Sequence, residues 1–164
     1  MKNTQVLGSN DPFTEIITAV ARHPNLEDFC KYLSFAGINE GNLAGACLVT
    51  LSANTQLSYL GGFLPQTFKS VLNELMSEIF LAISQRDTSR ICAPDTLTSV
   101  EADMCIALIP SILKPSATGV LILFFQGPEK NYVLDAKTQL ALAFACEMYS
   151  SKHENQDQHE YPSD

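Results

Sequence analysis

The stretch Gly119–Phe125 (GVLILFF) decides the fold, because it carries an apolar side chain at every position after its glycine. A strand that is apolar on both faces must be covered on both faces, so it belongs in the centre of a sheet. Gly127 and Pro128 follow it closely, and both residues interrupt regular structure. The sequence therefore predicts a central strand at 119–125, with helices on each side of the sheet.

Further stretches are expected to pair with this strand. Leu43–Leu51 (LAGACLVTL) and Gln56–Phe63 (QLSYLGGF) flank a short polar turn, which is typical of a hairpin. Met104–Ile109 (MCIALI) is apolar and stops at Pro110, which cannot donate a ladder hydrogen bond. Arg90–Cys92 is a candidate for another short strand. Together these segments predict a central antiparallel sheet.

Helical periodicity marks the segments around the strands. Asp11–Phe35 divides into two helical pieces, interrupted at Pro24 and restarted by Asn25 as a cap. Phe68–Ile83 keeps the i, i+3/i+4 spacing of an amphipathic helix, and Asp135–Ser150 is apolar on two sides. We expect the 68–83 helix to cover one sheet face and the terminal helices the other, which is an α+β fold.

Length and composition suit a single domain, since the chain has 164 residues, of which 46% are hydrophobic and 17% charged. We expect an N-terminal arm over 1–10, one domain over 11–150, and an acidic flexible tail or linker stub over 151–164. The net charge of −8 argues against direct nucleic-acid binding and against attachment to an anionic membrane.

Targeting signals and cysteine usage bear on location. The first residues lead into no apolar segment, and the apolar runs are far shorter than the ~20 residues of a membrane span. The 5 cysteines are widely spread and odd in number, which does not suit a disulfide framework. A reducing cytoplasm is the expected location.

The second hairpin resembles the core hairpin of the GAF domain family. There, a strand that ends in proline is followed by a turn and a Gly-Val-Leu strand, and Met104–Pro110 and Gly119–Phe125 match that order. Tyr132, Asp135 and the apolar run Leu140–Cys146 are similar to the aromatic residue, acidic cap and closing helix that come next in the family. PAS, profilin-like and roadblock-like plans are the alternatives.

The resemblance covers about Leu26–Tyr149 and has implications for function. It implies a regulatory sensor that binds a small molecule between one sheet face and the helix-and-loop layer above it. The family often dimerises through its terminal helices and often precedes an output domain, such as the helix-turn-helix of LuxR-type regulators. The resemblance therefore implies either a sensor taken from a longer protein, with an output domain after Asp164 that controls a process such as transcription, or a stand-alone sensor. No motif specifies a ligand or cofactor.

On the GAF plan, the cavity is surrounded by the inward positions of Leu57–Phe63, by the 68–83 helix and by the segment Ile91–Cys105. The candidate ligand-binding residues are Ser58, Tyr59, Phe63, Phe68, Leu72, Met76, Glu101, Asp103 and Met104. Most are apolar, as ligand pockets usually are, and a few could supply polar groups. The same residues also suit a filled core. A ligandless dimerisation or protein-interaction module is therefore the alternative function.

No residue pattern predicts catalysis or a metal site, because the sequence has no C-x-x-C, H-E-x-x-H or nucleophile-elbow motif. Cys92 is the one cysteine in a loop-like setting, near Arg86 and Arg90, whose charges would favour a thiolate. A Cys-based redox enzyme or sensor is accordingly the weaker alternative. Glu101 and Asp103 are better explained as residues of a solvated loop than as an acid/base pair.

The terminal helices carry more apolar side chains than one sheet face can accept. The expected surplus, and so the expected dimer interface, is Phe13, Ile16, Ile17, Val20, Leu142, Cys146 and Tyr149. An exposed apolar patch of that size normally marks an interface, which predicts a homodimer through these helices. The alternative is that the N-terminal helix folds back over the closing helix and hides the surplus.

Overall fold

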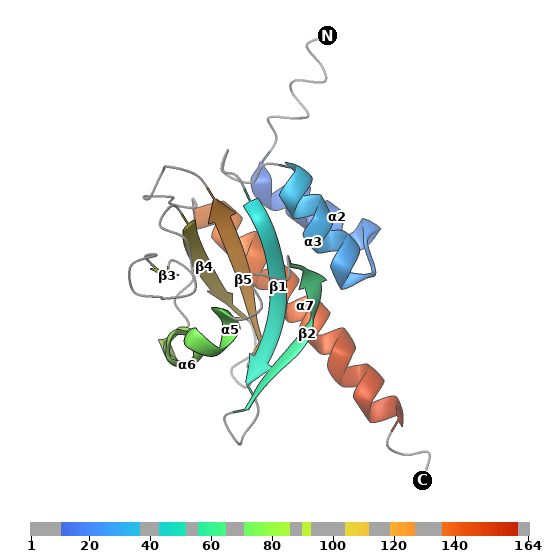
Figure 1. The fold of residues 1–164 in the computed structure, drawn as a ribbon. Coiled ribbons are helices and arrows are strands. Elements are labelled where there is room, and N and C mark those ends of the chain that lie inside the picture. The colour runs from blue at the N-terminus through green and yellow to red at the C-terminus, as the bar shows by residue number, and fades with distance from the viewer. Residues whose placement is uncertain are drawn as a thin grey trace.

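The computed structural model describes residues 11–36, 43–51, 56–64, 71–85, 90–92, 104–111, 119–126 and 136–160 (Figure 1). In chain order the elements are α2 (Pro12–Arg22), α3 (Leu26–Ala36), β1 (Leu43–Leu51), β2 (Leu57–Phe63), α5 (Val71–Glu74), α6 (Met76–Gln85), β3 (Arg90–Cys92), β4 (Met104–Pro110), β5 (Gly119–Gln126) and α7 (Ala136–Glu160). The chain has an α+β fold.

The strands form an antiparallel sheet that, within the described ranges, has the order β2-β1-β5-β4-β3. β5 lies in the centre between β1 and β4, which confirms the position predicted from its apolar run. β1 and β2 form the expected hairpin, and the short strand β3 is present at the far edge of the sheet. The predicted strand boundaries agree with the structure to within about one residue.

Side-chain alternation along the central strands divides the core into two parts. One part, here called the α6-side core, receives from β5 the side chains of Val120, Ile122 and Phe124. The other, here called the α7-side core, receives Leu121, Leu123 and Phe125. Successive side chains of a strand point to opposite faces of the sheet. The apolar run of β5 therefore contributes buried side chains to both parts of the core.

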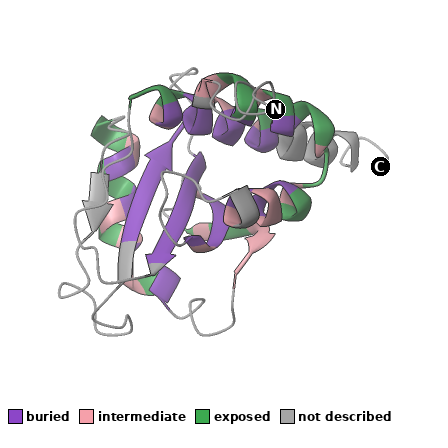
Figure 2. Ribbon diagram, turned by 90° about the horizontal axis from the view of Figure 1, so that it is seen from above, coloured by how far each residue is buried: buried purple, intermediate pink, exposed green. Residues whose placement is uncertain are grey.

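Helices cover the two faces as the sequence predicts. α5 and α6 pack on one face, while α3 and α7 pack on the other, with α2 lying against α7 (Figure 1). The view from above shows the buried strands enclosed between helices whose outer surfaces carry exposed residues (Figure 2).

The edge strand β2 contains a local irregularity that requires glycine. Pairing with β1 shifts register between Leu48 and Val49, where Leu60 is the extra residue on the β2 side. Gly62 has φ +150°, and a Cβ there would lie 2.4 Å from the Ala46 carbonyl oxygen. A residue with a side chain therefore fits neither the backbone angle nor the space at position 62.

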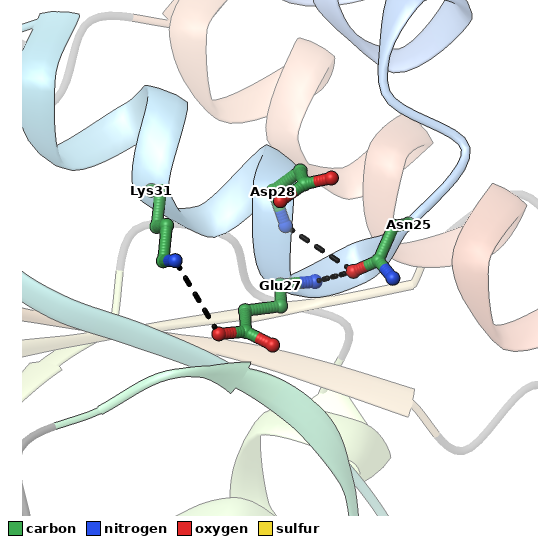
Figure 3. A network of polar contacts seen from close by, with 4 residues as sticks. All are labelled: Asn25, Glu27, Asp28 and Lys31. Carbon is green, nitrogen blue, oxygen red and sulfur yellow. Dashed lines mark hydrogen bonds and ion pairs between the residues drawn. The ribbon is translucent and has the colours of Figure 1, made fainter.

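Asn25 restarts the helix after the break at Pro24, as predicted. Its Oδ1 accepts hydrogen bonds from the backbone N–H groups of Glu27 at 2.8 Å and Asp28 at 3.3 Å (Figure 3). The Glu27 carboxylate then pairs with Lys31 at 3.5 Å, one turn along α3. Asp11 stands at the N-cap position of α2, but its side chain makes no capping bond to the backbone of that helix.

Two boundaries differ from the sequence prediction. The segment predicted as one helix at 68–83 is described from Val71 onward and divides at Leu75, which separates α5 from α6. α7 continues to Glu160, so residues 151–160 are helical rather than part of a tail. A helix made of polar residues shows no apolar stripe, and its sequence pattern therefore does not distinguish it from a linker. The predicted arm at 1–10 lies outside the described residues.

Candidate functional site

The ligand cavity was expected between the sheet and the helices α5 and α6. The described side chains in that layer form the α6-side core, in which Leu75, Ile79 and Phe124 are fully buried. They come from the helices and from the central strands, and they pack together between the two layers. Within the described residues this layer is a packed core.

The structure brings only a few of the candidate ligand-binding residues together. Leu72 of α5 is buried in the α6-side core, and Met76 is half-buried at the start of α6. Ser58 is exposed on β2, and Tyr59 is 43% exposed at that edge of the sheet. Met104 lies at the start of β4, where its side chain is outside the described residues, as are Phe68, Glu101 and Asp103.

Phe63 lies on the opposite face from the one expected. It pairs with Ala46 and packs against the α7-side core, with the Lys31 ammonium 5.9 Å from its ring centroid. The extra residue in β2 shifts the later side chains of the strand relative to β1. Phe63 therefore cannot share a wall with Leu72, which belongs to the other core.

Two cavities lie on the α7 side of the molecule, although the sequence predicts no cavity there. One, of about 430 Å³, is lined by residues of α2 and α3, including Glu15, Arg22 and Tyr32. The other, of about 390 Å³, lies between the start of α3 and β2 and is lined by residues that include Asn25 and Tyr59. Both depend on how the helices pack, which a pattern within one helix does not reveal.

A polar cluster is buried where α7 crosses the end of β4. The Ser111 hydroxyl donates to one carboxylate oxygen of Glu147, and the Ser151 hydroxyl donates to the other at 3.4 Å. The backbone N–H of Ser111 donates to the Gly119 carbonyl at 3.0 Å, which joins β4 to β5 beside the cluster. Because Glu147 is only 6% exposed, these bonds replace the water that a carboxylate would otherwise bind. The cluster fixes the position of α7 along the sheet.

The described cysteine side chains are buried free thiols. Burial raises the pKa of Cys30 and of Cys146 to about 12, and it raises the pKa of Cys47 as well. A thiol that stays protonated is a poor nucleophile, so these cysteines serve as small apolar residues. Cys92 lies in strand β3 and not in a loop, and its side chain is outside the described residues.

The residues expected at a dimer interface lie mostly inside the chain. The members of that set that are buried in the α7-side core are Ile16, Val20, Leu142, Cys146 and Tyr149. Phe13 packs partly against the same core, and Ile17 is half-buried. The apolar surplus is thus covered because α2 folds back on α7, which was the alternative interpretation. The homodimer itself stays a prediction, and it cannot rest on these buried side chains.

None of the helices within the described ranges combines the length and hydrophobicity that crossing a lipid bilayer requires. The described residues also contain no cluster of three His, Cys, Asp or Glu side chains suited to a metal ion. Comparison with known proteins finds no protein-family model that matches the chain and no curated protein sequence that is significantly similar to it.

Proposed function

We propose that this chain is a GAF-like regulatory domain of the cytoplasm, which senses a small molecule and passes the signal on through α7. The proposal assigns no catalytic step to the chain. Its output is a second domain or partner joined to the end of α7, such as a regulator of transcription. Homodimerisation would allow two α7 helices to act on that output together.

The observation that carries the proposal is the double role of α7. Its first half is part of the fold, since Leu142, Ala145 and Cys146 are buried in the α7-side core. The same helix then continues to Glu160 and extends past the sheet (Figure 1). A rigid element that begins in the core and leaves it can transmit a change in packing. The antiparallel sheet with helical cover on both faces is compatible with the GAF plan and also with its PAS, profilin-like and roadblock-like alternatives.

The packed α6-side core favours the second candidate function, a ligandless GAF-like interaction module. Such a module needs no cavity between the sheet and α6, and the described apolar side chains of that layer are buried in one cluster. The two candidates share the fold and the role of α7. They differ in whether a small molecule stabilises one conformation.

Native mass spectrometry of the purified 164-residue chain tests the sensor. We expect a non-covalently bound small molecule that is released on denaturation. Leu72→Trp places a larger ring in the α6-side core and should abolish this added mass, whereas Phe80→Trp, at a 40% exposed position of the same helical layer, should retain it. Circular dichroism checks that both variants fold. A chain that carries no added mass under any growth condition contradicts the sensor and supports the ligandless module.

The same measurement reports the oligomeric state. Leu140 and Met148 on α7 are 44% and 36% exposed, so they are available to a second copy while the expected interface residues are buried. If the chain dimerises through α7, Leu140→Glu with Met148→Glu should give a folded monomer. Phe80→Glu with Leu81→Glu on α6 is the control and should remain a dimer. A wild-type chain that is monomeric at micromolar concentration contradicts dimerisation.

A further inference from the structure

The cavity between α2 and α3 has the features of a small-molecule site. Its volume is about 430 Å³, within the roughly 300–1,000 Å³ typical of ligand pockets. Its lining includes the side chains of Thr14, Glu15, Thr18, Arg22, His23 and Tyr32. It lies on the helical side of the α7-side core, away from the layer between the sheet and α6.

Opposite charges stand at the two ends of this cavity. Glu15 is in the first turn of α2 and Arg22 is in its last turn. Their seven-residue separation corresponds to about 10 Å along the helix, which places both residues on the same face about two turns apart. Among the described residues, neither side chain forms an ion pair. The cavity therefore offers an anion and a cation that are both free to bind a ligand.

Tyr32 of α3 lines the same cavity as Glu15 and Arg22. Burial raises the pKa of its hydroxyl, the Glu15 carboxylate raises it further, and the Arg22 guanidinium opposes the rise. Both charged groups consequently lie within electrostatic reach of one aromatic ring. That ring also packs against the His23 imidazole, with the centroids 5.6 Å apart. An apolar or aromatic part of a ligand would find a flat surface there.

The wall formed by the end of α2 is held by one bond from α7 and by one within α2 itself. The Tyr149 hydroxyl of α7 donates to the His23 carbonyl oxygen. The His23 backbone N–H donates to the Ala19 carbonyl at 2.9 Å. A wall held in this way needs little ordering when a ligand binds, which favours affinity.

We propose that the α2–α3 cavity binds a small zwitterion of amino-acid or dipeptide size. Arg22 pairs with its carboxylate, Glu15 pairs with its ammonium group, and Tyr32 contacts its side chain. A guanidinium suits a carboxylate because it can donate two parallel hydrogen bonds. This site goes beyond the proposed function, since it lies on the other side of the sheet from the expected sensor cavity.

Isothermal titration calorimetry of the full chain tests the site with L-phenylalanine and the dipeptide Gly-Phe as probes. At least one should bind in the micromolar to millimolar range. Phenethylamine lacks the carboxylate and N-acetyl-phenylalanine lacks the ammonium group. Each should bind at least about tenfold more weakly than the matching zwitterion, because one charged pair is lost. The proposal would be overturned if either control compound bound as tightly as the matching zwitterion. It would also be overturned if neither zwitterion bound at about 10 mM.

Charge-neutral variants locate the binding. We expect Arg22→Gln and Glu15→Gln each to lower the affinity for the tighter-binding probe by at least about tenfold. Glu78→Gln on α6 removes the same charge as Glu15→Gln at a position outside the cavity, and it should leave affinity unchanged. Glu15 and Arg22 are exposed, so the variants are expected to fold, and thermal melts verify this. If Glu78→Gln weakens binding as much as Glu15→Gln, the assignment to this cavity is wrong.

Discussion

Gly119 begins β5 at a point where the sheet and α7 approach each other closely. A Cβ at this position would lie 2.3 Å from Ser150 Oγ and 3.4 Å from Cys146 Sγ. The first distance is too short for any carbon–oxygen contact, so α7 or the serine side chain must move to admit a methyl group. The glycine therefore sets how tightly the closing helix packs on the central strand.

Gly119→Ala is expected to lower the free energy of unfolding by about 1–3 kcal/mol, because it overpacks the contact with α7. Ser150→Ala removes the oxygen that clashes and should restore much of the loss when it is combined with Gly119→Ala. Urea denaturation of the two single variants and the double variant measures this coupling. Strictly additive effects would show that the contact with Ser150 is not the cause.

Among the described helices, α2 and α7 make the most extensive helix–helix contact, and they share the α7-side core. α2 presents its buried face through Ile16, Ala19 and Val20, while Ile17 is only half-buried. A helix with one apolar stripe gains most of its stability from the neighbour that covers the stripe. The packing of α2 should accordingly depend on Ile16 more than on its neighbour in sequence.

The adjacent isoleucines of α2 provide a matched comparison. Ile16→Ala should reduce the free energy of unfolding by about 2–5 kcal/mol, since it leaves a cavity in the α7-side core. Ile17→Ala removes the same atoms from a half-buried position and should lower the free energy of unfolding by clearly less. Thermal or urea unfolding measures both. Equal losses would mean that α2 is not held by the face seen in the structure.

At the scale of the whole molecule, the buried thiols link stability to pH. Cys30 and Cys146 have pKa values of about 12 in the folded chain, raised by burial from 9.0. Burial also raises the pKa of Tyr149, which acts in the same direction. In the unfolded chain these groups release their protons at lower pH than in the folded chain. The folded state consequently binds more protons across this alkaline range.

The free energy of unfolding should be unaffected by these thiols below about pH 8 and should fall as pH rises from 9 toward 12. Each thiol contributes a slope of up to about 1.4 kcal/mol per pH unit. Urea denaturation at several pH values checks the decline. Cys30→Ala with Cys146→Ala is less stable at neutral pH but should show a shallower decline. An unchanged slope in that variant would contradict the assignment to the thiols.

The sheet and its covering helices could be predicted from the sequence because the signals are local. The apolar run of Gly119–Phe125, the proline that ends β4, and the helical period before and after the sheet each specify one element. Their order leaves few ways to bury the apolar faces. The position of β5 in the centre follows directly from the lack of a polar face.

The candidate site could be predicted far less well, because it depends on contacts between elements. The extra residue Leu60 changes the face that Phe63 occupies, and a bulge in an edge strand leaves little trace in the apolar pattern. Ile16 and Leu142 lie on helices whose apolar faces must be buried. The sequence does not say whether another helix of the same chain or a second copy of the chain buries them. Glu15 and Tyr32 belong to different helices, so their shared cavity was not foreseen.

The dimensions of α7 make it a lever. Its 25 residues span about 37 Å at 1.5 Å per residue, and about 15 Å of that length follows Ser150. If the base of the helix pivots by roughly ten degrees about the Gly119 contact, its far end moves by about 2–3 Å, although side chains near the pivot shift by only a fraction of that. A displacement too small to disturb the core is thus enlarged at the tip.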